Sequence, residues 1–490
     1  MRRFRSRTAK LVEKGVQDST SCKVGEIFHC DRAKGVTVTN SSQRDEEKIL
    51  ARAEEIENQI ISLLQRLVRI PSPTGEEGRA QEFVAKYLKH LGLKVEMWEP
   101  DVEKIFERFP ENAQYPSHWQ HDLILPYSEK PTYQDLVKSG KIEVLNYKDR
   151  PNVVSRFGTR RGGRSIILNG HIDTVTIEPR NEWTHNPFGG EIVKGKLYGR
   201  GASDMKGGIA AAIGAIQSIL EAGVKLKGEV IFESVVNEEH AGNGTLACIC
   251  EGIYADGAVV MEPSENNVYV GNHGGIYWGI RVKGNPSSPR ARWKGTKQFG
   301  VSAIEKLPPL IQGMVDLETK QRNRNSNFNP FSLVIGKIEG GTYETATASE
   351  CTIKGVVYFG PEIGSIADIR RMLRHTLERA CKGDPWFKQF PPDLFFFHDD
   401  DPSRQDRRHP LVSVVVKAAQ ETSGIRPSVE VGPFACDMRH LKNQGNIPTV
   451  IYGPGASDQA HRPDEYFPVA DLLSSIKALA LAIYRWCNGA

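Results

Sequence analysis

The chain has 490 residues, of which 39% are hydrophobic and 25% are charged, and it contains no apolar run long enough to cross a bilayer. This composition argues against a membrane protein. The 64 basic and 60 acidic side chains leave a net charge of only +4, which argues against a nucleic-acid binder and favours a small-molecule partner. The length exceeds what one hydrophobic core usually serves, so we expect two folded units and an accessory segment.

The eight cysteines are sparse, and apart from Cys248 and Cys250 they lie far apart in the sequence. This spacing does not resemble a disulfide framework, so we expect a reducing compartment, the cytoplasm. Residues 1–45 show no helical or strand periodicity, and no apolar stretch of a secretory signal follows their basic start. Their Cys22, His29 and Cys30 lack the paired spacing of a zinc finger. We therefore expect a poorly ordered basic tail, with an organelle transit peptide as the alternative.

Residues 46–267 predict the first part of a larger unit. Apolar residues recur at helical spacing from Ala53 to Leu67, and a second helix covers Phe83 to Leu91 with Gly92 as its cap. Residues from about 100 to 150 give no assignable pattern. Beyond them, strands and a small-residue helix alternate, which is typical of a mostly parallel sheet with helices on its faces. The strands are expected at 152–157, 165–168, 229–236 and 257–261, and the helix at 205–222.

Residues 268–398 change this order and predict a second, inserted unit. Their pattern reads strand, helix, strand, strand, helix, strand, which indicates a ferredoxin-like α+β sandwich. The elements are expected at 276–282, 301–319, 331–338, 352–359, 366–381 and 394–397. Residues 399–490 return to the larger unit, with helices at 411–419 and 469–486 and a strand at 449–452. We interpret Asp399, Asp400 and Asp401 as a solvated loop between the units, not as a cation site.

Potential metal ligands stand at the ends of predicted strands or in the loops beyond them, where open α/β sheets bind ligands. Taken singly, each is more simply a structural histidine or part of a solvated turn. Taken together, two imidazoles and three carboxylates match the needs of two zinc ions if one carboxylate bridges them and a position remains for water. These residues are His171, Asp204, Glu239, Glu262 and His461.

Several segments then resemble the motifs of one family. Residues 166–175 (IILNGHIDTV) and 199–208 (GRGASDMKGG) resemble motifs of the zinc-dependent acetylornithine deacetylase, succinyl-diaminopimelate desuccinylase, aminoacylase and glutamate carboxypeptidase family. Residues 237–239 (NEE), 261–263 (MEP) and 453–465 (GPGASDQAHRPDE) resemble the remaining motifs in the family's order. The resemblance spans roughly residues 46–490, and five ordered motifs are far more specific than one short pattern.

The resemblance implies a zinc-exopeptidase-like α/β catalytic domain, with 268–398 as a lid that also forms a homodimer interface. It implies two Zn²⁺ per subunit, for which Co²⁺ can substitute. His171 and Glu262 would bind one ion, Glu239 and His461 the other, and Asp204 would bridge them. Asp173 would orient His171, since a metal-bound imidazole needs an acceptor at its other nitrogen. Glu238 would be the general base in hydrolysis of an N-acyl amino acid or a related small amide.

Glutamate at position 262 is similar to the deacylases and carboxypeptidases of the family, whereas the aminopeptidases tend to have aspartate. Two alternatives remain: a dipeptide-cleaving metallo-carboxypeptidase, and a homologue that binds ligand with little or no turnover. An activity panel separates them, and no feature of the sequence does.

The lid side of the site departs from the family pattern. Ser288 stands where the family has a histidine that reaches the other subunit's active site, and Thr345 where it often has an asparagine. Tyr358 lies near the expected place of the arginine that holds a substrate carboxylate. Either another donor such as His273, Arg290 or Arg292 substitutes, or the substrate lacks a free carboxylate, or activity is weak. The candidate substrate-binding residues are Ser288, Arg292, Thr345 and Arg439.

Overall fold

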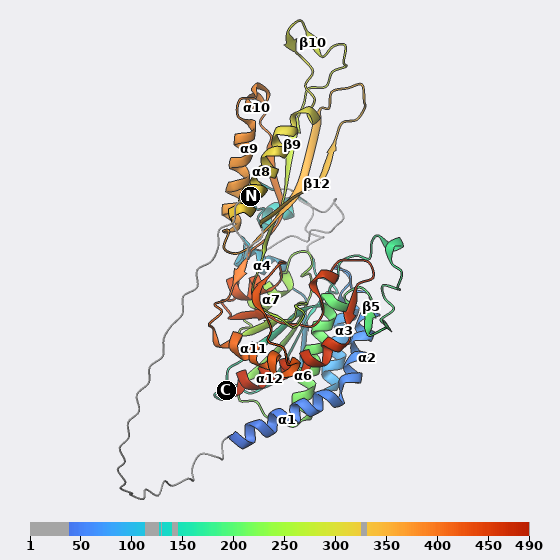
Figure 1. Ribbon diagram of the computed structural model, residues 1–490, viewed down its shortest axis with the longest axis vertical. Coiled ribbons are helices and arrows are strands. Elements are labelled where there is room, and N and C mark those ends of the chain that lie inside the picture. Colours follow the sequence, from blue (N-terminus) through green and yellow to red (C-terminus); the bar gives the residue numbers. More distant parts are fainter. Residues whose placement is uncertain (1–38, 113–126, 129, 140–145, 325–330, 490) are drawn as a thin grey trace, which may run out of the picture. The chain divides into compact units, whose positions relative to one another are not determined.

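The computed structural model describes residues 39–112, 127–128, 130–139, 146–324 and 331–489 (Figure 1). The described residues from Asp45 onward form one compact unit. Cys22, His29, Cys30 and most of the expected tail lie outside the described residues. Helix α1 (Thr39–Glu55) begins inside the range expected to be tail, so the helical region starts earlier than predicted.

The helix expected around Ala53–Leu67 is two helices, because α1 ends at Glu55 and α2 (Glu57–Val68) follows a break at Ile56. Helix α2 buries Ile60, Leu63, Leu64 and Leu67, the spacing that places side chains on one helical face. Helix α3 (Gly78–His90) ends before Gly92, whose φ of 79° is the left-handed conformation that favours glycine as a helix terminator.

The large sheet has the order β1-β2-β6-β3-β7-β17-β8-β15, with β16 paired to β8. Its centre, from β6 through β3 and β7 to β17, is parallel, and strands toward its two ends add antiparallel pairs. This confirms the predicted mostly parallel sheet. Its strands are β1 (Lys94–Trp98), β2 (Asn152–Gly158), β3 (Ile166–His171), β6 (Glu229–Val235), β7 (Ala258–Val260), β8 (Val268–Asn272), β15 (Ser403–Arg404), β16 (Val429–Gly432) and β17 (Thr449–Ile451).

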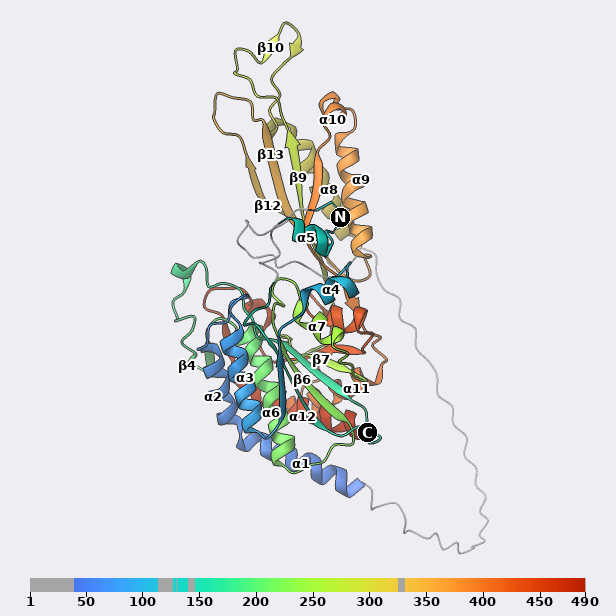
Figure 2. The same cartoon turned by 180° about the vertical axis from the view of Figure 1, so that it is seen from behind.

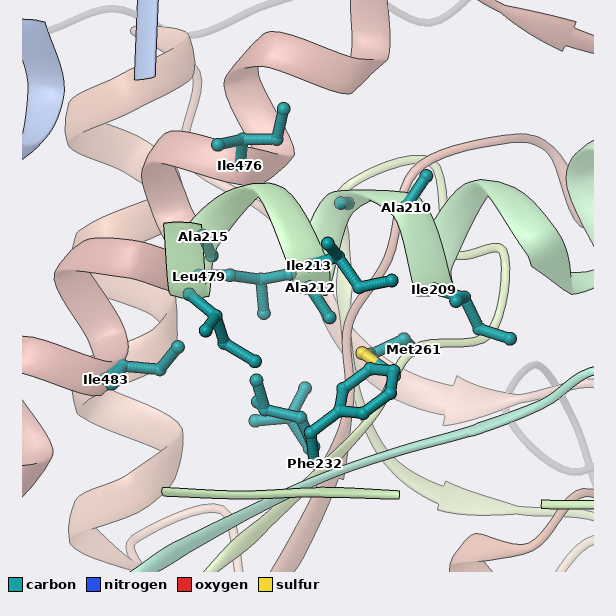
Figure 3. Packing of buried hydrophobic residues seen from close by; sticks show 14 of the residues in the cluster. Ile209, Ala210, Ala212, Ile213, Ala215, Phe232, Met261, Ile476, Leu479 and Ile483 are labelled. Carbon is teal, nitrogen blue, oxygen red and sulfur yellow. The ribbon is translucent and has the colours of Figure 1, made fainter. Parts of the chain in front are cut away.

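Both faces of this sheet are buried, because alternate residues of one strand enter different apolar cores. Ile166 and Leu168 of β3 face one core, and Ile167 between them faces the other. Figure 3 shows the first core, where Ile213 of α6 (Gly207–Glu221) and Leu479 of α12 (Ala470–Asn488) lie on the side of these helices that faces Phe232 of β6. The small residues of α6 permit close packing: a Cβ on Gly208 would lie 2.0 Å from the main-chain oxygen of Met261. Helix α11 (Pro410–Ser423) packs beside α12, and α7 (Asn243–Cys250) contributes Cys248 to the other core.

The inserted unit is the predicted ferredoxin-like sandwich, called the lid from here on. Its sheet has the order β12-β13-β9-β14, every pair antiparallel, and α8 and α9 cover one face (Figures 1 and 2). The elements are β9 (Gly274–Lys283), α8 (Pro308–Arg324), β12 (Phe331–Gly340), β13 (Glu350–Phe359), α9 (Ile366–Cys381) and β14 (Asp393–Asp400). Between β9 and α8 the chain forms the small hairpin β10 (Trp293–Lys294) and β11 (Lys297–Gln298).

The aspartates at the end of the lid were misjudged from the sequence. Strand β14 continues through Asp400, and Asp399 and Asp400 are buried, so the expected solvated loop is wrong. Asp399 pairs with Lys130 at 2.7 Å and with Arg370, and Asp400 pairs with Arg439 at 3.1 Å. These cations come from distant parts of the chain, and their charges are what make burial of the carboxylates tolerable.

The stretch left unassigned between about 100 and 150 contains α4 (Val102–Arg108) and α5 (Tyr133–Lys138). The main chain of Tyr127 pairs with Phe396 of β14, and α4 packs on α7. This stretch therefore contacts both the lid and the larger unit. The remaining elements are β4 (Glu191–Val193), β5 (Lys196–Tyr198), β18 (Tyr466–Pro468), α10 (Pro385–Gln389) and the short turns η3 (Arg180–Glu182), η4 (Ala202–Lys206), η5 (Ile304–Lys306), η6 (His440–Gln444) and η7 (Ser457–Gln459). Across the described ranges, no helix combines the length and the apolar character needed to span a membrane.

Candidate metal centre

Three of the five predicted ligands lie where strands of the large sheet end. His171 is the last residue of β3, Glu239 follows β6, and Glu262 follows β7. Asp204 lies in η4, immediately before α6, and His461 lies in the loop beyond β17 with a φ of 62°. Because β3, β6 and β7 are parallel neighbours, their carboxyl ends meet at one edge of the sheet.

Asp204 lies between the two imidazoles and offers one oxygen to each. Its Oδ1 is 3.1 Å from His171 Nε2, and its Oδ2 is 3.4 Å from His461 Nε2. Glu262 Oε1 lies 3.6 Å from His171 Nε2, while Glu239 Oε2 lies 2.9 Å from His461 Nε2. Asp204 is thus common to the contacts of both imidazoles. The ligand atoms that lie within 4.8 Å of one another form two sets that share His171: one adds Asp204 and Glu239, the other Glu238 and Glu262.

These separations suit metal binding. Ligand atoms about 2.0–2.1 Å from a tetrahedral zinc ion lie roughly 3.3 Å from one another. The donor set also demands positive charge, because Asp204, Glu238, Glu239 and Glu262 bring four carboxylates into one partly buried group. The residues present therefore fit divalent cations.

The electrostatics of this group show the same demand. The charge of Glu239 raises the pKa of His461 to about 11. Burial of the imidazole opposes this shift, and Asp204 adds to it. Burial would lower the pKa of His171, but Glu262, Asp204 and Glu238 outweigh it and hold this pKa well above its usual value. Burial, together with the charges of Asp204 and Glu239, raises the pKa of Glu262 to about 7. Metal cations would replace protons as the partners of these groups.

Asp173 contacts His171 through its main chain. His171 Nδ1 donates to the carbonyl oxygen of Asp173 at 3.0 Å, whereas the nearer carboxylate oxygen is 3.7 Å away. The carboxylate instead accepts from the main-chain N–H groups of Glu238 (3.1 Å) and Glu239 (3.2 Å) and from the Thr74 hydroxyl (2.8 Å). Asp173 thus fixes both His171 and the turn that carries Glu238 and Glu239.

Glu465 holds the Asp204 turn in a comparable way, a role that sequence reasoning missed. Its buried carboxylate accepts from the main-chain N–H groups of Gly201, Ser203 and Asp204 at 2.9–3.1 Å, and from Arg200 at 2.7 Å. Glu465 ends the motif that contains His461, so its position in the motif was the available signal.

A cavity of about 380 Å³ opens over the metal ligands and reaches the lid. Glu238, the predicted general base, lines it with one oxygen 3.8 Å from His171 Nε2. The cavity is also lined by Tyr277, Tyr358, His398 and Asp400 of the lid, together with Phe434 and Arg439.

Of the predicted substrate-binding residues, only Arg439 lines this cavity. Ser288 and Thr345 are exposed on lid loops, and Arg292 pairs with Glu305. The loop with β10 lies at the end of the lid that points away from the larger unit (Figure 1). His273 and Arg290, considered as alternative donors, do not line the cavity either.

The sequence model of Peptidase family M20/M25/M40 matches residues 167–485. The chain belongs to this family. Its sequence is 30% identical over 470 residues to N-formyl-4-amino-5-aminomethyl-2-methylpyrimidine deformylase of Halalkalibacterium halodurans, covering 90% of this chain and 97% of that protein. It is 26% identical over 337 residues to succinyl-diaminopimelate desuccinylase of Rhodopseudomonas palustris, covering 66% and 82%.

A solved M20-like structure, the di-peptidase Dug1p from Saccharomyces cerevisiae, superposes with a TM-score of 0.64 at 14% identity, over 90% of this chain and 98% of that one. At this identity the likeness shows the fold alone. The family and the fold class predicted from the motifs are thereby confirmed.

Proposed function

We propose that the protein is a two-zinc amidohydrolase that removes a formyl or other small acyl group from the nitrogen of a small amine. The observation that carries this proposal is the position of Asp204 between two imidazoles, with Glu238 beside them in one cavity. The relatives named as a deformylase and a desuccinylase both cleave acyl groups from nitrogen, and the deformylase is matched over nearly its full length.

His171 and Glu262 would hold one ion, Glu239 and His461 the other, and Asp204 both. Cobalt would substitute for zinc, since the ligands are the same nitrogen and oxygen donors. When bound, the ions polarise the scissile carbonyl and lower the pKa of water to about 7.

Glu238 is the side chain placed to move protons. It faces the cavity, and its main-chain N–H is fixed by Asp173. It would take a proton from the attacking water and pass one to the leaving nitrogen, which then departs as a neutral amine. Burial, with the charges of Glu262 and Asp437, holds the pKa of Glu238 well above its usual value, and His171 and Arg439 oppose this shift. Bound cations would bring this pKa back toward the range of a base.

The test is turnover of a substrate panel by protein loaded with zinc or cobalt. We expect hydrolysis of N-formyl amides to exceed that of N-acetyl and N-succinyl amino acids and of dipeptides. Glu238→Gln should lower kcat by roughly 10²–10⁴-fold, the usual contribution of a general base, with metal content unchanged. Fast hydrolysis of dipeptides would favour the carboxypeptidase alternative. Absence of turnover across the panel would contradict an enzyme and favour the ligand-binding homologue.

We further propose that the protein is a cytoplasmic homodimer joined through the lid. The cysteines in the described segments are free thiols and form no disulfide bonds with one another, as expected of a reducing compartment. Strand β12 is an edge strand that exposes Val334 and Ile338 by about half. Exposed apolar edges of this kind favour pairing with another chain.

A further inference from the structure

The cavity over the metal ligands contains a guanidinium that is already paired. Among the described residues that line it, Arg439 is the only arginine or lysine. Its side chain is 4% exposed, with one nitrogen 3.1 Å from Asp400 and another 3.9 Å from Glu238. Both ends of this cation therefore face carboxylates of the same chain.

Asp400 is the carboxylate that forms an ion pair with Arg439. It ends strand β14 and lines the cavity, and its two oxygens each lie 3.0 Å from His398 Nε2. Burial would raise the pKa of Asp400, but His398 and Arg439 outweigh it and hold this pKa well below its usual value. The carboxylate is therefore ionised at neutral pH.

Among the described residues that line the cavity, no arginine or lysine is then left unpaired for an acidic substrate. Two divalent ions would balance the four carboxylates of the metal centre, and Asp400 balances Arg439. The other lid residues that line the cavity are Tyr277, Tyr358 and His398: the two tyrosine hydroxyls lie 2.9 Å apart, and His398 contacts Asp400. Phe434 of the larger unit adds an apolar ring. A carboxylate near Asp400 would meet a like charge in a partly desolvated space, which is strongly unfavourable.

We propose that the Asp400–Arg439 pair makes this cavity select N-acyl amines whose amine portion carries no carboxylate. This inference rests on the proposed function and narrows its substrate class. The preferred amine portion is neutral or cationic and flat enough to contact Tyr277, Tyr358 and Phe434, and its N–H groups donate to Asp400. N-acyl amino acids are disfavoured, because their carboxylate finds Arg439 occupied.

Two substrates that differ in a single carboxylate test this inference: N-formylphenethylamine and N-formylphenylalanine. With zinc-loaded full-length protein, we expect kcat/KM to be at least about tenfold higher for N-formylphenethylamine. Asp400→Asn removes the competing charge and frees Arg439, so this preference should shrink about tenfold, mainly through a lower KM for N-formylphenylalanine. Asp399→Asn is the matched control, because it removes a neighbouring buried charge that does not line the cavity, and it should keep the wild-type preference.

Different experimental results would overturn the inference and the proposed function. If the kcat/KM of the wild-type protein for N-formylphenylalanine equals or exceeds that for N-formylphenethylamine, the inference is overturned while the proposed function stands. An unchanged preference in folded Asp400→Asn overturns the role assigned to the pair. Should that variant not fold, inhibition of the wild type by phenethylamine and phenylalanine replaces it, and stronger inhibition by phenylalanine overturns the inference. No hydrolysis of any N-formyl amide by metal-loaded protein overturns both the proposed function and the inference.

Discussion

Asp204 is the residue on which the two halves of the metal centre depend, because its two oxygens face different imidazoles. Asp204→Ala should therefore lower the metal content below two zinc per chain, since both ions lose a ligand at once. Metal analysis after gel filtration measures this directly. Asp458→Ala, which changes an exposed aspartate in the His461 loop, is the control and should retain both ions. Two zinc per chain in the Asp204 variant would refute the bridging assignment.

Asp173 acts on the site through main-chain groups, so its effect should appear in the rate more than in metal content. Asp173→Asn replaces one of two acceptor oxygens by an N–H₂ group that faces N–H donors of Glu238 or Glu239. We expect kcat to fall about 10- to 100-fold, the usual cost of losing a group that orients metal ligands. Thr74→Val, which removes only the hydroxyl donor to Asp173, should cost less. Wild-type kcat in the Asp173 variant would show that the turn holds its position without this carboxylate.

At the scale of elements, short apolar runs within β2, β3 and β6 made these strands predictable, because strands buried on both faces contain hydrophobic segments. Helix α7 was missed, since eight residues that include glycine, threonine and two cysteines carry little helical periodicity.

The proximity of the five candidate ligands could be predicted because each follows a recognisable strand or motif. Glu465 was missed although it ends the motif that contains His461, whereas Thr74 offered no such signal, since its contact with Asp173 is created by the fold. The burial of Asp399 and Asp400 was hidden for the same reason: Lys130 and Arg439 reach them from distant segments.

Strand β6 buries a carboxyl group whose ionisation is coupled to stability. Burial raises the pKa of Glu233 to about 7, although Asn169 donates to one of its oxygens. A pKa that is higher in the folded state gives stability that is complete below the unfolded pKa, near 4.3, and is lost as pH rises toward 7. This group alone should lower the free energy of unfolding by about 3 kcal/mol across that window.

Glu233→Gln keeps the shape of the side chain and removes the titration. Urea denaturation at pH 5 and pH 7.5 should therefore show a smaller loss of stability in the variant than in the wild type. Because the other titrating groups are common to both proteins, the difference between them isolates Glu233. Equal losses would show that Glu233 titrates in the folded protein as it does in the unfolded chain.

At the scale of the whole molecule, residues 45–490 bring the lid and the larger unit together around one cavity. The stretch with α4 and α5 reinforces this arrangement, because Phe106 and Leu136 belong to the same apolar core as Leu246 of the larger unit and Trp278 of the lid. The lid wall of the cavity, including Tyr358 and Asp400, is thus held by an apolar contact and by main-chain pairing at Phe396.

The predicted roles of Ser288 and Thr345 require a second subunit, because neither lines the cavity of its own chain. We expect the wild-type protein to sediment as a dimer. Val334→Lys combined with Ile338→Lys places two charges on the exposed edge strand β12 and should give a monomer, since desolvating unpaired charges at an interface is costly. Val315→Lys, at a comparably exposed position on α8, is the matched control and should remain dimeric.

If Ser288 and Thr345 act in the partner's cavity, the monomer should lose activity while keeping its zinc. A fully active monomer would show that each chain carries a complete site.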